Sequence, residues 1–188
     1  RHVADDISLA CLEGKTSVRA IDVGSKDFRY AHALARWLGK AAIESERGKS
    51  RRRVSLTGIE LDGHRVYDDL SSRKDHGETY AREVDSQGAD DKVTYEVRDF
   101  LQHTERNVDV VFLFFPFVLE YALVRWGLPR SCFLPAKMFD HVFETLRPGG
   151  LVVVMNHTAD ERRRQIELLR DSGFEILKSV DARSELVD

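Results

Sequence analysis

The sequence predicts an α/β protein with a doubly wound, mainly parallel sheet between two layers of helices, a three-layer α/β/α arrangement. Three observations predict this fold class. Short apolar runs of strand length alternate with segments of helical periodicity along the whole chain. A glycine turn joins the first apolar run to the first helical segment. The run Val108–Phe114 is apolar at nearly every position, which is typical of a strand covered on both faces.

The first strand and helix are expected within Val18–Leu38. Val18–Val23 is a short apolar run, and Gly24 opens the turn that follows it. Apolar residues then return at helical spacing, at Tyr30, Leu34, Trp37 and Leu38. Ligands of open α/β sheets bind beyond the carboxyl ends of the strands, where this turn lies. Taken alone, the stretch fits a ligand-binding turn and a plain βα turn equally well.

The remaining elements continue the alternation. Further strands are expected at Val54–Leu61, Val93–Val97, Val108–Phe114, Leu151–Met155 and Phe174–Val180. Helices are expected as a lead-in over residues 1–17, at His64–Leu70, at Glu78–Val84, at Ala136–Leu146 and from Thr158 to Asp171. The last helix should open with a capping box formed by Thr158 and Glu161.

We interpret residues 1–188 as a single domain with two polar insertions, 41–53 and 71–91. The first insertion ends in the basic run Gly48–Arg53, which could contact phosphates. A solvated loop is the favoured interpretation, because the run is short and lacks the interleaved aromatic residues of a nucleic-acid site.

Composition excludes several classes of protein. The chain is 42% hydrophobic with a net charge of -3, so a disordered protein or a nucleic-acid binder is not expected. The longest apolar run, Val110–Leu119, is shorter than the roughly 20 residues that cross a membrane, so no membrane association is expected. With only Cys11 and Cys132 available, we expect a reducing compartment and a cytoplasmic protein, and no metal site.

Three consecutive strands are each expected to end in an acidic residue, namely Asp22, Glu60 and Asp99. The carboxyl ends of parallel strands share one edge of a sheet, so these acids should lie together where a ligand binds. A carboxylate at the end of the second strand, such as that of Glu60, can accept hydrogen bonds from both hydroxyls of a ribose. For any one acid alone, a solvated residue or a helix cap is the favoured interpretation, whereas three in sequence behind a glycine turn favour a binding site.

The order of these motifs resembles that of the class I S-adenosylmethionine-dependent methyltransferases, which have a Rossmann-like fold. The residues that carry the resemblance are Ile21-Asp22-Val23-Gly24, Gly58-Ile59-Glu60-Leu61-Asp62, Val97-Arg98-Asp99-Phe100 and Leu146-Arg147-Pro148-Gly149-Gly150. The resemblance covers about residues 18–180 and rests on the order of the motifs more than on any one of them. It implies S-adenosylmethionine as cofactor and a methyltransferase that acts on an unidentified acceptor, most simply a small molecule.

The resemblance also implies cofactor-binding roles. Gly24 and Ser25 would contact the methionine part, and Lys26 would either meet the cofactor carboxylate or point to solvent. Asp22 would order the turn or meet the amino group, and Glu60 would hold the ribose. Leu61 and Asp62 would flank the adenosine, Asp99 would accept from the adenine amino group, Phe100 would pack on the ring, and Phe115 would face the transferred methyl group. One departure stands out, since Lys26 and Phe28 occupy positions where the family has glycines.

No catalytic base is assigned. Candidates near the expected mouth of the site are His64, Tyr67, His103, Tyr121 and His157, each weak without a partner. Aromatic residues follow the fourth strand, and they fit an apolar acceptor pocket and ordinary core packing equally well: Phe115, Phe117, Tyr121 and Trp126.

Two alternatives stay open at this point. An NAD(P)-binding oxidoreductase would also place an acid after its second strand, but the Gly-x-Gly-x-x-Gly fingerprint is incomplete after Gly24. A non-catalytic protein with the methyltransferase fold would act through a partner surface, for example an apolar patch at Leu119–Trp126. The sequence does not indicate the oligomeric state.

Overall fold

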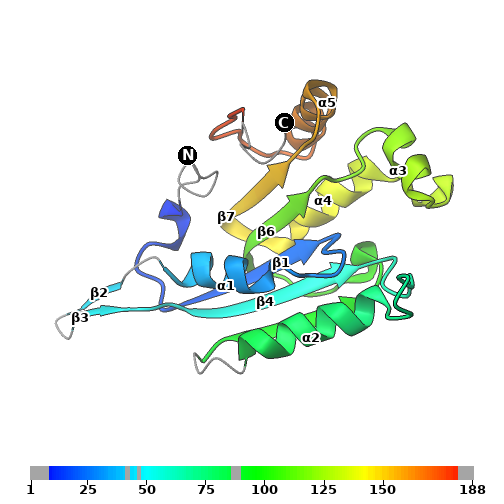
Figure 1. The fold of residues 1–188 in the computed structure, drawn as a ribbon. Helices are drawn as coiled ribbons and strands as arrows, with labels where there is room; N and C mark the ends of the chain where they lie inside the picture. Colours follow the sequence, from blue (N-terminus) through cyan, green and yellow to red (C-terminus); the bar gives the residue numbers. More distant parts are fainter. Residues whose placement is uncertain (1–8, 41–42, 46–47, 86–89, 182–188) are drawn as a thin grey trace.

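The structure, a computed structural model, describes residues 9–40, 43–45, 48–85 and 90–181. Its centre is a five-stranded sheet in the order β5-β4-β1-β6-β7 (Figure 1), in which every neighbouring pair is parallel. The strands are β1 (Ser17–Val23), β4 (Arg53–Glu60), β5 (Lys92–Val97), β6 (Val108–Phe114) and β7 (Leu146–Met155). The predicted parallel sheet is therefore confirmed.

Helices cover both faces of this sheet. Those that pack on it are α1 (Ala31–Gly39), α2 (Arg73–Asp85), α4 (Pro135–Thr145) and α5 (Ala159–Asp171). The chain also forms α3 (Glu120–Trp126) and the short 3-10 turns η2 (Ala10–Leu12), η3 (Phe100–Gln102) and η4 (Arg130–Cys132). One hydrophobic core joins α1 and α2 to the sheet, and a second core joins α4 and α5 to its other face. This is the expected three-layer arrangement.

The alternation of side chains along β1 explains the two cores. Ala20 faces the α1 and α2 layer, whereas Ile21 faces the α4 and α5 layer, and both are buried. In β6 every residue except Phe114 is fully buried, as expected for a strand covered on both sides. Burial on both faces confirms the prediction of a covered strand, which rested on the apolar run.

Local signals set two of the helices. Thr158 Oγ1 accepts from the backbone N–H of Glu161 and the Glu161 carboxylate accepts from that of Thr158, so the predicted capping box opens α5. In α4, Phe139 and Val142 are buried against the second core, while Phe143 is exposed. The amphipathic stripe therefore predicted this helix, although its buried face is narrower than expected.

Polar contacts fix the amino-terminal ends of the strands. The Asp109 carboxylate accepts from the Arg19 backbone N–H at 2.9 Å and from Arg147 Nε at 2.6 Å, and it pairs with Lys15. Arg52 is buried and donates to the carbonyls of Leu12, Lys15 and Leu38. The prediction that the basic run is a solvated loop is thus wrong for Arg52. Its guanidinium is buried, and three backbone carbonyls accept the hydrogen bonds that water would otherwise accept.

Residues 41–53, expected to be a polar loop, instead include two short strands. β2 (Ile43–Ser45) and β3 (Gly48–Ser50) pair antiparallel outside the main sheet.

The helix expected at His64–Leu70 is also absent. These residues form turns and a single β-bridge between Val66 and Ser72, and Leu70 has a left-handed φ of +67°. Val66 and Leu70, expected on one side of a helix, are 58% and 85% exposed, so the segment lacks the packing against the core that would stabilise a helix. The helix begins only at Arg73, and α2 is longer than the predicted Glu78–Val84.

The sixth strand, expected at Phe174–Val180, does not form. Within the described residues β7 pairs with β6 alone, so its other edge is unpaired. Phe174 and Ile176 pack on the second core without joining the sheet. Of the expected lead-in helix, residues 1–8 lie outside the described residues, and the rest forms only η2.

None of the described helices is long and apolar enough to cross a membrane.

Candidate functional site

The register of the sheet brings the predicted strand-end acids to one edge. Asp22 in β1 lies beside Gly58 in β4, and Glu60 at the end of β4 lies beside Val97 in β5. The Arg98 backbone N–H then donates to the Glu60 carbonyl at 3.0 Å. The chain segments that carry Asp22, Glu60 and Asp99 therefore meet at the carboxyl edge, as predicted.

The turn after β1 keeps open space beside a glycine. Gly24 has a φ of +75°, and a Cβ added there would meet nothing within 4 Å. The backbone N–H groups of Gly24 and Ser25 both donate to the Ile59 carbonyl, at 2.8 and 3.2 Å. The turn is thus fixed to β4 while its outer side stays accessible to a ligand.

Lys26 and Phe28 adopt left-handed conformations, with φ of +54° and +57°. This conformation costs roughly 1–2 kcal/mol per residue without glycine, so surrounding contacts must hold it. The Phe28 ring is fully buried against Gly58, where a Cβ would lie 2.9 Å from it. The Tyr95 hydroxyl donates to the Lys26 carbonyl. The turn therefore keeps glycine-like geometry with larger side chains packed beneath it.

Two buried oxygen atoms in this turn lack hydrogen-bond partners among the described residues, Asp22 Oδ1 and Ser25 Oγ. Both residues are fully buried. The Tyr30 hydroxyl donates to Asp22 Oδ2 at 2.8 Å, and burial raises the pKa of Asp22 to about 7. Unsatisfied buried acceptors cost free energy, so a donor supplied by a ligand would be favourable here.

Glu60 is mostly buried and already accepts two backbone hydrogen bonds. Its Oε2 accepts from the Lys26 N–H at 2.7 Å and its Oε1 from the Asp62 N–H at 2.8 Å. Arg73 Nη1 lies 3.7 Å from Oε1. Burial raises the pKa of Glu60, and these donors oppose the shift. Each carboxylate oxygen has a second lone pair, so Glu60 can still accept from a ligand hydroxyl.

Asp99 and Phe100 lie at this edge but are engaged locally. Asp99 Oδ1 caps η3 by accepting from the Leu101 N–H at 2.9 Å. Phe100 is buried in the second core, with its ring edge-to-face against His141 at 4.9 Å. Phe100 therefore contributes to core packing and offers little ring surface to a ligand.

Two other residues singled out in the sequence do present apolar surface. Leu61 is 45% exposed and Phe115 is 41% exposed. Phe115 has a left-handed φ of +58°, and its ring stacks on that of His157 at 3.8 Å. An aromatic side chain held outward in this way is available for contact with a ligand.

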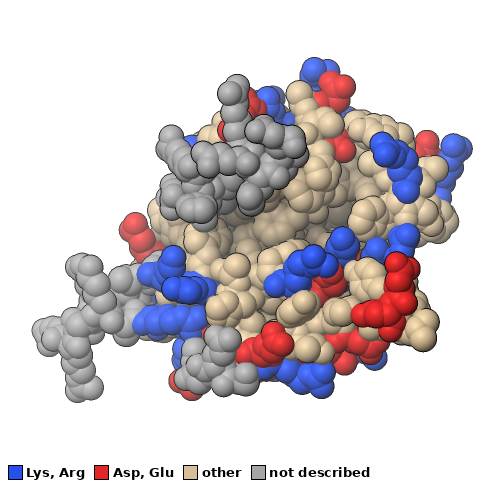
Figure 2. Space-filling view, viewed as in Figure 1, with Lys and Arg blue, Asp and Glu red and all other residues tan. Residues whose placement is uncertain are grey.

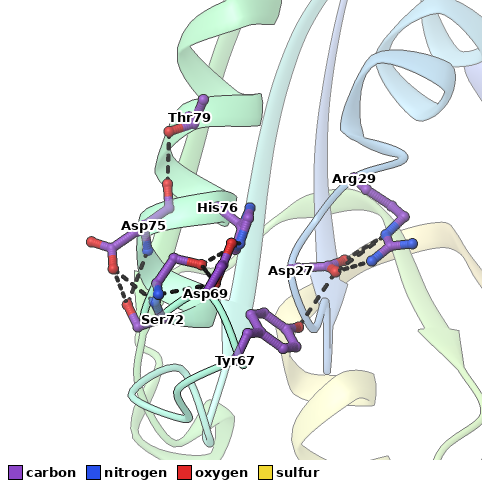
Figure 3. Close-up of polar contacts among 9 residues, drawn as sticks. Asp27, Arg29, Tyr67, Asp69, Ser72, Asp75, His76 and Thr79 are labelled. Carbon is purple, nitrogen blue, oxygen red and sulfur yellow. Dashed lines mark hydrogen bonds and ion pairs between the residues drawn. The ribbon is translucent and has the colours of Figure 1, made fainter.

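The loop after β4 is tied to the turn after β1 (Figure 3). The Tyr67 hydroxyl donates to Asp27 Oδ2 at 3.4 Å, and Arg29 donates to both oxygens of the same carboxylate. Burial opposes ionisation of Asp27, but these Arg29 contacts dominate and lower its pKa. In the first turn of α2, His76 Nε2 lies 2.6 Å from Ser71 Oγ.

Sequence reasoning missed a cluster of cations around Trp126. The groups within 6 Å of its ring centroid are Lys26 Nζ, Arg65 Cζ and Arg73 Cζ. The Trp126 carbonyl accepts from Arg65 Nη1 at 3.1 Å. In the space-filling view, Lys and Arg side chains gather between the end of β1 and α3, beside a hollow (Figure 2). No local pattern could reveal this cluster, because its members come from four separate segments.

The candidate bases are scattered. His64 and Tyr121 are exposed, and Tyr67 contacts Asp27. His103 is buried between two carboxylates, 3.8 Å from Glu96 and 3.6 Å from Glu105. Two candidates contact predicted cofactor-binding residues: His157 stacks on Phe115, and the His103 ring lies 6.3 Å from that of the buried Phe100.

Solved structures share this architecture. The match to a [4+2]-cyclase, SpnF, has a TM-score of 0.57 at 19% identity and covers 89% of this chain and 56% of that one. A SAM-dependent O-methyltransferase from Thermotoga maritima matches with a TM-score of 0.52 at 20% identity, covering 85% and 46%. The chain has the class I methyltransferase fold. A precorrin-6y C5,15-methyltransferase from Geobacter metallireducens has this fold too, with a TM-score of 0.53, 15% identity and coverage of 89% and 69%.

The chain spans about half the length of the first two of these structures. The sequence matches no protein-family model and no curated protein. At such low identities the methyltransferase fold alone is shared, and activity must be argued from the site.

Proposed function

We propose that the protein binds S-adenosylmethionine at the carboxyl edge of β1, β4 and β5 and transfers its methyl group to a small-molecule acceptor. The observation that carries the proposal is the turn at Gly24. It combines open space beside a left-handed glycine with two buried oxygens that lack donors, on Asp22 and Ser25. In a methyltransferase fold this is where the methionine part of the cofactor would lie.

The residues present fit such a cofactor. Asp22 Oδ1 would accept from its ammonium group, and the ribose hydroxyls would donate to the free lone pairs of Glu60. Leu61 and Asp62 would flank the adenosine, and Asp99 would accept from the adenine amino group. The deep burial of Phe100 leaves it a supporting role beneath the site.

When bound, S-adenosylmethionine supplies a methyl group activated by its sulfonium. The task left to this chain is alignment of the acceptor and exclusion of water. Phe115 would provide an apolar wall, supported from behind by the ring of His157. A base is needed only for an acceptor that must lose a proton, and His157 is then the nearest candidate by contact.

Calorimetry with S-adenosylhomocysteine and S-adenosylmethionine tests the binding step. We expect heat of binding and a raised melting temperature with both ligands; no heat and no thermal shift would contradict the proposal. NADH fluorescence is measured in parallel, since NADH binding without S-adenosylhomocysteine binding would favour the oxidoreductase alternative.

Glu60→Gln tests the ribose contact. The substitution removes the charge and keeps one acceptor oxygen, so only one of the Lys26 and Asp62 N–H groups retains its partner. We expect affinity for S-adenosylhomocysteine to fall about 10-fold. Glu167→Gln, on the solvent side of α5, is the matched control and should bind like the wild type. Unchanged affinity in folded Glu60→Gln would remove Glu60 from this role.

Transfer is tested separately from binding, because a cyclase shares the fold. Release of S-adenosylhomocysteine in the presence of candidate acceptors would support a transferase. Binding without release for every acceptor would favour the non-catalytic alternative.

The two cysteines, both free, support the proposed cytoplasmic location.

A further inference from the structure

Three cations converge on one aromatic ring beside the proposed cofactor site. Their distances to the Trp126 centroid are 5.8 Å for Lys26 Nζ, 5.9 Å for Arg65 Cζ and 5.2 Å for Arg73 Cζ. These residues come from the turn after β1, the loop after β4 and the first turn of α2. We call these four residues the Trp126 cluster.

Neighbouring carboxylates do not neutralise the Trp126 cluster. Arg73 lies 3.1 Å from Asp62 and 3.7 Å from Glu60, and Arg65 reaches Asp62 only at 3.5 Å. Lys26 Nζ forms no ion pair and no hydrogen bond within the described part of the chain. Lys26 also interacts electrostatically with Asp27, but that carboxylate is already paired with Arg29. The three positive charges of the cluster thus share two further negative ones, and like charges at this spacing repel one another.

Arg73 provides a second, independent indication of a ligand. Its side chain is only 3% exposed, yet its Nε forms no hydrogen bond with the described residues. A buried guanidinium N–H without an acceptor is costly. An oxygen brought against the Trp126 ring by an anion would satisfy this donor and offset the excess charge.

Aromatic surface surrounds the same position. Trp126 is 37% exposed, and the Phe117 ring lies 6.2 Å from its own, tilted by 54°. A flat apolar group can pack against these rings while its charged end meets the cations.

We propose that the Trp126 cluster binds the carboxylate or phosphate group of an aromatic small molecule. We identify this molecule with the methyl acceptor, and that identification rests on the proposed function. Binding of the anion by itself does not depend on the proposed function. Lys26, Arg65 and Arg73 supply the donors, and Trp126 supplies the stacking surface.

Trp126 can report on its own site. The chain has two tryptophans, so Trp37→Phe leaves Trp126 as the sole emitter. Benzoate, phenyl phosphate and the neutral benzamide are titrated into this variant. We expect saturable fluorescence changes with one or both anions, weakened by salt, and at least about 10-fold weaker binding of benzamide. The tighter anion identifies which acid group the site prefers. Equal binding of benzamide would overturn the proposal.

Lys26→Gln and Arg65→Gln test the cations without removing the buried Arg73. Both side chains are exposed, so these variants should fold, which circular dichroism checks. We expect each to weaken anion binding about 10-fold relative to the reporter. Arg36→Gln, an exposed charge loss on α1, is the matched control and should not change it. Wild-type anion affinity in both cluster variants would overturn the proposal.

Titrations are repeated with saturating S-adenosylhomocysteine. Undiminished anion binding supports an acceptor site beside the cofactor. Competition would overturn the acceptor assignment, because the anion would then occupy the place of the cofactor carboxylate. Anion binding without any S-adenosylhomocysteine binding would sink the proposed function but leave the anion site intact.

Discussion

At the scale of single residues, the end of β1 and the turn after it contain buried polar atoms without partners and residues in unfavourable backbone conformations. Asp22 is fully buried and retains one oxygen without a donor among the described residues. Lys26 and Phe28 hold conformations that glycine adopts more readily. Such strained and unsatisfied groups persist only where the surrounding structure stabilises them, and they concentrate at ligand sites.

Asp22→Asn should change how stability depends on pH. The pKa of Asp22 is about 7 in the folded protein, against 3.8 for an unperturbed aspartate. Between these values the unfolded chain ionises while the folded protein stays protonated, so Asp22 lowers wild-type stability as the pH rises. Asparagine does not titrate, so the variant lacks this pH-dependent loss. The free energy of unfolding of the variant minus that of the wild type should therefore increase by roughly 2–4 kcal/mol from pH 4 to pH 8.

Urea unfolding of both proteins across this range measures the effect. Other titrating groups are common to both proteins and cancel in the difference. Parallel stability curves for wild type and Asp22→Asn would show that burial does not raise this pKa.

At the scale of elements, close packing decides where local propensity does not. Gly77 lies inside α2, where alanine would normally stabilise a helix by about 1 kcal/mol. A Cβ at this position would lie 2.5 Å from the Tyr95 ring of β5. The Tyr95 hydroxyl is itself bound to the Lys26 carbonyl, so the ring cannot easily move.

Gly77→Ala should therefore destabilise the protein by about 1–3 kcal/mol, against its helix propensity. Removing the whole ring in a Tyr95→Ala background should abolish the penalty, because Tyr95 Cγ itself would lie 2.7 Å from the added Cβ. A double-mutant cycle from urea unfolding measures this coupling. Equal effects of Gly77→Ala in both backgrounds would refute the contact as the cause.

At the scale of the whole molecule, the two edges of the sheet differ in character. The amino-terminal edge has saturated polar contacts, with Asp109 joined to Lys15, Arg19 and Arg147. The carboxyl edge has unsatisfied oxygens and an uneven charge balance. The first edge stabilises the fold, and the second edge is the one at which we propose that a ligand binds.

Asp109→Asn should destabilise the protein without weakening ligand binding. Burial opposes ionisation of Asp109, but its hydrogen bonds to Arg19, Lys15 and Arg147 dominate and lower its pKa below 3.8. Its contribution is therefore present above that value and is lost as the pH falls through the folded pKa. We expect a loss of about 2–3 kcal/mol at pH 7 that shrinks in acid.

Unfolding in urea at pH 7 and near pH 3 measures this contribution. Asp90→Asn, at an exposed position, is the control and should be neutral. A loss of the same size at both pH values would contradict the assigned ion pairs.

Patterns along the chain determined the strands of the sheet, the capping box of α5 and the acids at the strand ends, because hydrophobic periodicity and capping are local properties. They did not exclude the helix at His64–Leu70 or the strand at Phe174–Val180, since each depends on a neighbouring surface or strand edge. Tertiary structure alone decided that Phe28 fills the space beneath the turn after β1, and that Lys26, Arg65 and Arg73 meet at Trp126. Contacts between segments this far apart depend on how the layers pack, which no local pattern encodes.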